Sequence, residues 1–280
     1  MRGDRDQARA LLEDAETLIG MKAGFLLRMK LYRNLAQFNQ SQGRYDAALD
    51  HYRTCQHIAG EAGDHHSLAN AIGNIGAIHA EQGEYAEAMK CYLRKLTDCE
   101  AGGDMLGVSI ALGNIGALHY EQGRRHEAMR CCEQKLAISE RMGDLVGVCY
   151  TIGNLGNVHF DLGELEKARE CFRRLIAIAE QTGDRFSLSH AYDNMASVHR
   201  AEGDLRLALE HYDKAIDLAR EMGLKLELAQ YNHHKAALLF AMDEPGPARE
   251  ANALAQLLAR ELGQGVPGTD AVGPDHWPTG

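Results

Sequence analysis

The chain has 280 residues, of which 45% are apolar and 25% charged, as is ordinary for a folded chain of one or two domains. Its 30 basic residues are outnumbered by 40 acidic ones, and the net charge of −10 disfavours nucleic acids and anionic membranes as main partners. The longest apolar run, residues 236–242, is far shorter than the roughly 20 residues of a membrane span, and the N-terminus has no signal-peptide core, so a soluble cytoplasmic protein is expected.

Glycine divides the chain at a fixed interval of 40 residues, while all five prolines lie in the last 36 residues. Two glycine series share this interval: Gly43, Gly83, Gly123, Gly163 and Gly203, and then Gly63, Gly103, Gly143, Gly183 and Gly223. An internal repeat of this length is typical of a solenoid, whose units bury their apolar faces by stacking on their neighbours. We therefore expect an all-α stack of repeated units.

The first segment, residues 1–23, aligns with the second half of the later units. Gly3, Asp6 and Ala8 fall in register with Gly43, Asp46 and Ala48. This register predicts a half repeat with one helix at about residues 4–20. Such a helix would leave one face without a partner inside its own repeat.

Six complete hairpins are predicted over residues 24–262, starting near residues 24, 64, 104, 144, 184 and 224. In residues 64–103, for example, apolar side chains recur at three- and four-residue steps on both sides of Gly83. The glycines of the second series can end one helix in the left-handed conformation, and the aspartates that follow four of them can cap the next helix. Alanine recurs at positions where two helices would approach closely, at Ala48, Ala88, Ala128, Ala168, Ala208 and Ala248.

The last hairpin has lost these markers, because Leu224 replaces the capping aspartate and Met242 and Asp243 replace the turn glycine. Loss of the repeat pattern is expected in a terminal unit. Residues 263–280, rich in glycine and proline, are predicted to form a disordered tail. Together with the first half repeat, the pattern predicts about 13 helices.

The repeated positions resemble the tetratricopeptide repeat, as one unit illustrates with Gly76, His79, Gly83, Tyr85, Ala88 and Tyr92. The resemblance covers residues 3 to about 262. A period of 40 and the missing proline at the end of the second helix indicate a subclass. The strings GNIG at 73 and 113 and GNLG at 153 resemble the long repeats of Leu-Gly-Asn-rich adaptor proteins and kinesin light chains. The resemblance implies a right-handed α-solenoid that acts as a protein–protein interaction scaffold.

An asparagine row is the strongest candidate site, formed by Asn34, Asn74, Asn114, Asn154 and Asn194. In the family that the chain resembles, this side of the first helix lines the concave groove. A carboxamide offers a donor and an acceptor, so it can pair with the backbone of an extended peptide. We predict that Gly73, Gly113 and Gly153 leave room for that backbone. Alternatively, each asparagine bonds a neighbouring helix end and fixes the superhelix.

Charged residues at the edge of the predicted groove suggest ligand selectivity. Lys30 and Arg33 make the first repeat basic, whereas Glu81, Glu121 and Asp161 make the middle acidic. A bound peptide is therefore expected to carry basic residues centrally. The alternative is that these side chains are only solvated charges.

No cofactor, metal site or enzymatic activity is predicted. The chain has no phosphate-binding glycine loop, HExxH or GxSxG motif. The histidines at 79, 119, 159 and 199 are expected to pack in place of a buried aromatic. The cysteines are expected to be reduced thiols that pack as small apolar side chains. The adjacent pairs His65/His66 and His233/His234 are interpreted as surface or cap residues.

The predicted function is an adaptor that binds a peptide or partner segment through the asparagine row. Two alternatives remain open. One is a structural module that forms a homo-oligomer through the open N-terminal helix, and the other is a regulatory array within a larger signalling protein.

Overall fold

The computed structural model describes residues 24–263, so the predicted helix at residues 4–20 and the predicted tail from 264 onward lie outside the described residues. Within 24–263 the fold is all-α, with twelve helices in sequential hairpin packing, and the predicted α-solenoid of tetratricopeptide type is confirmed.

The helices alternate between two roles, which we call A helices and B helices. The A helices are α2 (Phe25–Ser41), α4 (His65–Glu81), α6 (Met105–Glu121), α8 (Leu145–Asp161), α10 (Arg185–Glu202) and α12 (Lys225–Ala241). The B helices are α3 (Tyr45–Ala62), α5 (Tyr85–Gly102), α7 (Arg125–Met142), α9 (Leu165–Thr182), α11 (Leu205–Met222) and α13 (Pro245–Leu262).

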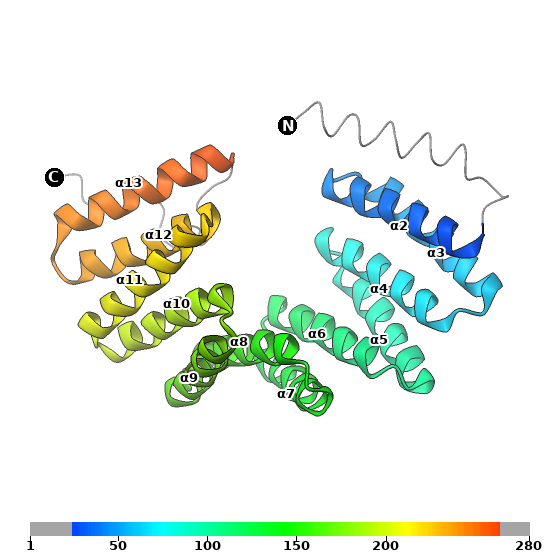
Figure 1. Cartoon of the computed structure of the whole chain (residues 1–280), viewed down its shortest axis with the longest axis horizontal. Helices are drawn as coiled ribbons and strands as arrows, with labels where there is room; N and C mark the ends of the chain where they lie inside the picture. Colours follow the sequence, from blue (N-terminus) through cyan, green and yellow to red (C-terminus); the bar gives the residue numbers. More distant parts are fainter. Residues whose placement is uncertain (1–23, 264–280) are drawn as a thin grey trace. The chain divides into compact units, whose positions relative to one another are not determined.

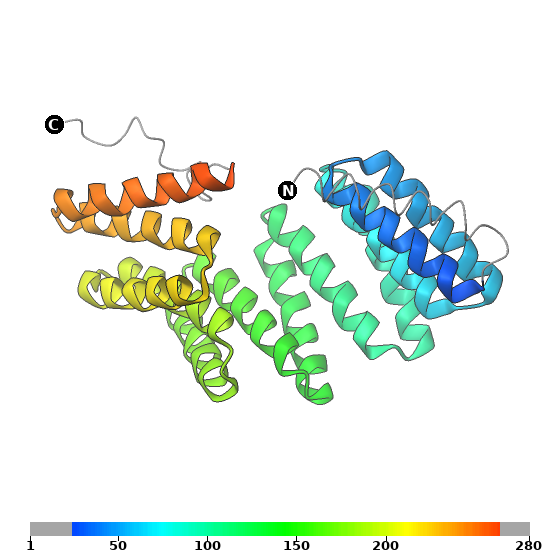
Figure 2. The same ribbon diagram turned by 45° about the horizontal axis from the view of Figure 1, so that its top comes forward.

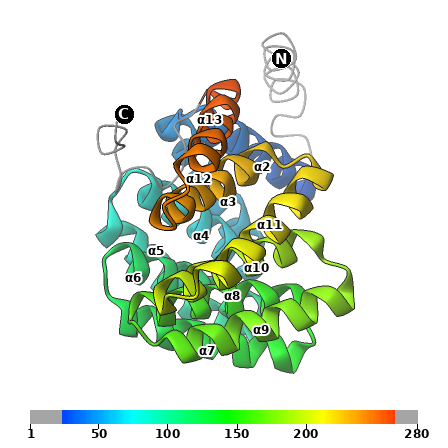
Figure 3. The same cartoon turned by 90° about the vertical axis from the view of Figure 1, so that its left-hand side faces the viewer.

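The chain forms two compact units, Met1–Ile138 and Ser139–Gly280, with the division inside α7. In the first unit, α2 to α6 lie side by side in chain order (Figure 1). In the second unit, α8 to α13 follow the same order, which Figures 2 and 3 show from two further directions.

Local capping explains where the helices begin and end. Gly63, Gly103 and Gly183 end B helices in the left-handed conformation, with φ of 66°, 69° and 71°. The aspartates predicted as caps accept hydrogen bonds from backbone N–H groups in the first turn of the next A helix; for example, Asp104 accepts from Gly107 at 2.9 Å. The predicted glycine stops and aspartate caps are present at these positions.

Small residues let the two helices of a hairpin pack closely. Ala88 and Ala168, which represent the repeated alanine, are both fully buried. In the second unit the buried ring of Phe172 packs with Ala168, Met195 and Val198. A Cβ atom on Gly156 would lie 2.5 Å from this ring, so glycine is required for the approach.

The terminal hairpin keeps the geometry without the markers. Leu224 precedes α12 without a side-chain cap and packs on a buried cluster that includes Tyr231. Asp243 takes the place of the turn glycine with φ of 60°, and it is the one non-glycine residue of the described part with positive φ. Aspartate tolerates this conformation better than most residues.

Candidate functional site

Each A helix exposes one continuous stripe along its length. Positions four, eight, eleven and fifteen residues after the first fall within an arc of about 80° on a helix of 3.6 residues per turn. On α6 this stripe contains an apolar end, a central amide and an acidic end, at Leu106, Ile110, Asn114, Ala117 and Glu121. On α4 it consists of His66, Asn70, Asn74, Ala77 and Glu81. We call this feature the A-face stripe.

All five asparagines of the predicted row occupy the middle of an A-face stripe. In the first unit Asn34 is exposed and Asn74 and Asn114 are half-buried; in the second unit Asn154 and Asn194 are half-buried. Among residues 24–263, none of their five side chains has a hydrogen-bond partner. Their role in binding stays a prediction.

Other asparagines of the chain show what an internally bonded carboxamide looks like here. Asn39 is 8% exposed and donates to the Leu35 carbonyl at 2.9 Å. Asn232 is 5% exposed and donates to the Leu228 carbonyl at 2.7 Å. Both amides donate to a backbone carbonyl of their own helix, whereas the five asparagines of the row make no such bond.

The charged residues predicted at the groove edge are all exposed. Lys30 and Arg33 lie on α2, and Glu81, Glu121 and Asp161 are the last residues of α4, α6 and α8. The negative end of each helix dipole therefore lies beside a carboxylate at these three positions. Their selectivity for a basic peptide stays a prediction.

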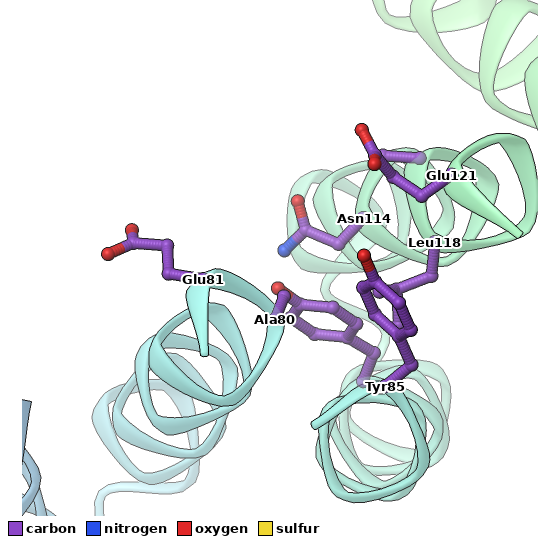
Figure 4. Close-up of a pocket in the computed structure, with 8 residues that line it drawn as sticks. Ala80, Glu81, Tyr85, Asn114, Leu118 and Glu121 are labelled. Carbon is purple, nitrogen blue, oxygen red and sulfur yellow. The ribbon is translucent and has the colours of Figure 1, made fainter. Parts of the chain in front are cut away.

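Two cavities of the first unit bring the predicted residues together. The larger, of about 430 Å³, is lined by Ala80, Glu81, Tyr85, Tyr92, Asn114, Ala117, Leu118 and Glu121. Glu81 lies on one side and Glu121 on the other, with Asn114 between them (Figure 4). The smaller, of about 120 Å³, joins Arg33 and Asn74 with Met29, Tyr52, Cys55, His66, Ser67, Asn70 and Ala71.

The prediction that Gly73 and Gly113 leave room for a ligand backbone is wrong. A Cβ atom on Gly73 would lie 2.7 Å from Cδ of Lys95, and one on Gly113 would lie 2.9 Å from Nζ of Lys135. The space above both glycines is therefore filled by lysine side chains from the following B helix. At Gly153 the nearest side-chain atom, Cδ2 of Leu175, is 3.5 Å from the built Cβ, an ordinary contact.

A hydrogen-bond relay at one end of α4 was not predicted. Nζ of the buried Lys95 donates to Oδ1 of Asn70 at 3.1 Å, and Asn70 Nδ2 lies 3.0 Å from Nε2 of His66. Nδ1 of His66 lies 2.8 Å from Asp104 Oδ2. Because an ammonium can only donate, Asn70 must present Oδ1 to Lys95 and its amino group to His66. In this arrangement His66 accepts at Nε2 and donates from Nδ1 to Asp104.

In the second unit a histidine and an aspartate replace the repeated asparagine and glycine. His234 stands in register with Asn194, and its Nδ1 lies 2.8 Å from Oδ1 of Asp193, which is 5% exposed. His233 is 6% exposed, and burial lowers its pKa. The interpretation of this pair as surface or cap residues is therefore wrong for His233, which is buried in the middle of α12, whereas His234 is half-buried.

The histidine row has mixed surroundings. Nδ1 of His79 and Nδ1 of His159 lie 2.5 and 2.6 Å from the carboxylates of Glu84 and Glu164. Burial lowers the pKa of His119 and of His199.

Within residues 24–263, no three histidine, cysteine or acidic side chains are grouped as metal ligands, and all seven cysteines are free thiols. None of the described helices is long and apolar enough to cross a membrane.

The tetratricopeptide repeat model matches residues 27–101, 107–181 and 147–221. No curated protein sequence matches the chain.

Solved structures resemble the fold at low sequence identity. BtubC (BKLC) from P. vanneervenii has 14% identity and a TM-score of 0.66 over 83% of this chain and 92% of its own. The apo form of RapI has 13% identity and a TM-score of 0.71 over 94% of both chains. Aspartyl phosphate phosphatase F from Bacillus subtilis has 15% identity and a TM-score of 0.73, over 95% of this chain and 70% of its own. These likenesses show the fold alone.

Proposed function

Because the chain belongs to the tetratricopeptide repeat family, whose members generally mediate protein–protein interactions and are typically non-catalytic, we propose that its A-face stripes hold an extended peptide segment of a partner. The asparagine row pairs with the backbone of that segment, and the acidic ends of the stripes select basic side chains.

The carrying observation is the absence of internal partners for the five asparagine side chains among residues 24–263. Asparagine is a poor helix former, and placing it repeatedly in helices destabilises them unless another interaction compensates. Asn39 and Asn232 gain that compensation from their own backbone, whereas the asparagines of the row are left with both amide groups available. This contrast favours a ligand over a purely structural role.

The spacing of the row suits an extended chain. Packed helices are about 8–10 Å apart, and an extended chain rises about 3.3 Å per residue, so one repeat corresponds to about three ligand residues. In the first unit α4 and α6 contact each other, which places Asn74 and Asn114 on neighbouring stripes. One carboxamide can accept from a ligand N–H and donate to a ligand carbonyl.

The test begins with selection of 12-residue peptides from a random displayed library on the full chain. Affinities of the selected peptides are then measured for the wild type, Asn114→Ala and Asn154→Ala by fluorescence anisotropy. We expect each substitution to weaken binding at least five-fold without changing helicity or the melting temperature, because loss of a hydrogen bond to the ligand backbone typically removes about 1 kcal/mol.

Asn232→Ala serves as the matched control, since it removes an asparagine that bonds only its own helix. It should lower stability while leaving peptide affinity unchanged. Equal affinities for the wild type, Asn114→Ala and Asn154→Ala would rule out the asparagine row as the binding element.

A further inference from the structure

The cavity between α4, α5 and α6 combines negative charge with aromatic walls. Glu81 and Glu121 end α4 and α6, so two helix C-termini add partial negative charge beside two carboxylates. Tyr85 and Tyr92 of α5 contribute phenol rings, and Asn114 contributes a carboxamide. Figure 4 shows the side chains of Tyr85, Asn114 and Glu121 gathered around this space.

The preceding repeat shows how the same space is satisfied when a side chain of the protein itself fills it. Gln40, Tyr52 and Glu81 stand 40 residues before Ala80, Tyr92 and Glu121. Nε2 of Gln40 donates to Oε1 of Glu81 at 2.6 Å, and the phenol of Tyr52 donates to Oε1 of Gln40 at 3.3 Å. One internal side chain therefore satisfies both the carboxylate and the buried phenol.

In the next repeat the filling side chain is missing, because Ala80 stands where Gln40 would be. Tyr92 is only 4% exposed and lines the cavity, yet its hydroxyl has no hydrogen-bond partner among residues 24–263. Over the same range, Glu121 has no ion-pair or hydrogen-bond partner. The Tyr92 hydroxyl therefore has its bonding capacity available to a group that enters the cavity of about 430 Å³.

The chemistry of the walls selects a planar cation. Two carboxylates and two helix ends favour positive charge, and tyrosine rings attract cations over their faces. Burial, with smaller contributions from Cys91 and Glu81, raises the pKa of Tyr92 to about 12, so its hydroxyl stays protonated and can still accept through its lone pairs. A guanidinium has five donors in a rigid fork, which can reach acceptors on two sides at once.

We propose that this cavity binds the guanidinium of an arginine side chain carried by the segment that the A-face stripes hold. The guanidinium pairs with Glu121 beside Asn114 and stacks on the tyrosine rings, while Glu81, whose Oε1 already accepts from Gln40, adds negative charge from the other side of the cavity. This inference rests on the proposed function and adds the identity of one ligand residue to it.

A single-residue probe tests the cavity apart from the asparagine row. N-acetyl-arginine methylamide and its citrulline counterpart, which has nearly the same shape without the charge, are titrated into the full chain by ¹H–¹⁵N NMR. We expect the arginine probe to shift the Asn114 signals and to bind at least ten-fold more tightly than the citrulline probe. Equal binding of the two probes, or no binding of the arginine probe, would overturn the inference.

Two variants localise the effect. Ala80→Gln places a glutamine where the preceding repeat has Gln40, and Glu121→Gln removes one carboxylate while keeping its shape. Each should weaken binding of the arginine probe at least five-fold. Ala86→Gln, on the exposed side of α5, is the matched control and should bind like the wild type. Wild-type affinity in a folded Ala80→Gln, or in Glu121→Gln, would refute the site.

The two proposals can fail separately. If Asn154→Ala binds library-selected peptides as tightly as the wild type while the arginine probe still prefers the wild-type cavity, the asparagine row is wrong and the cavity stands. If Asn154→Ala weakens peptide binding but arginine and citrulline probes bind equally, the cavity assignment is wrong and the row stands.

Discussion

Alanine substitution of two glycines one turn apart in α8 is expected to change the stability of the chain in opposite directions. A Cβ atom on Gly156 would lie 2.5 Å from Cε1 and 2.7 Å from Cζ of Phe172. That ring is 1% exposed and packed against Ala168, Met195 and Val198, so it has no free space to move into. At Gly153 the nearest atom is 3.5 Å away, so a methyl group fits.

The magnitudes follow from two opposing effects. Replacing glycine by alanine inside a helix stabilises it by about 1 kcal/mol. Overpacking a rigid core costs about 1–3 kcal/mol, and a 2.5 Å contact with a buried ring belongs at the upper end. Gly153→Ala should therefore gain about 1 kcal/mol and Gly156→Ala should lose about 2 kcal/mol.

Urea unfolding followed by circular dichroism at 222 nm measures the difference. With an m-value near 2 kcal/mol/M, the midpoints of the two variants should lie about 1.5 M apart on opposite sides of the wild type. An unchanged slope shows that the substitutions leave the surface exposed on unfolding unchanged, so the midpoints report stability directly. Midpoints that move in the same direction, or a Gly156→Ala as stable as the wild type, would refute the packing argument.

Three further predictions concern buried polar groups. Lys95→Met should raise the urea midpoint, since the buried ammonium has only the Asn70 amide as a hydrogen-bond partner among residues 24–263 and burial lowers the pKa of Lys95; a midpoint at or below that of the wild type would contradict this. Burial raises the pKa of the Cys55 thiol to about 11, so its contribution to stability is complete below about pH 8.5 and is lost as pH rises through 11; Cys55→Ala should lose less stability over that range in parallel urea titrations. His234→Ala should lower the free energy of unfolding by roughly 3 kcal/mol because it leaves the buried Asp193 without its ring partner. In a double-mutant cycle, adding Asp193→Ala to that variant should restore most of the lost stability; additive effects of the two substitutions would count against the pair.

The fold was predictable because its signals are local and repeated. Each glycine–aspartate pair ends one helix and caps the next through atoms within a few residues, and the apolar periodicity of each helix can be read directly. The asparagines, too, could be placed on one side of the A helices from helical geometry alone. The structure confirms the helices and caps, while the binding role of the row remains a prediction.

What the sequence did not reveal depends on which side chains meet between helices. Gly73 and Gly113 occur together with Lys95 and Lys135, whereas Gly153 occurs with Leu175, so a pairing signal was present in the register. Recognising it requires knowing that the B-helix stem lies over the A-helix glycine.

The cavity and the histidine–aspartate pair arise in the same way, from departures at register positions. Ala80 stands at the register position that glutamine occupies at Gln40. Asp193 and His234 likewise stand at positions that other repeats fill with glycine and asparagine. A departure becomes interpretable only when the neighbours of that position in space are known.

The side-chain amide signals of the row asparagines offer the most direct test of the central claim. In ¹H–¹⁵N spectra of the first unit within the full chain, titration with a library-selected peptide should shift the side-chain NH₂ resonances of Asn74 and Asn114 in proportion to occupancy. If the peptide saturates the protein while both NH₂ pairs keep their free positions, the carboxamides do not touch the ligand and the account is contradicted.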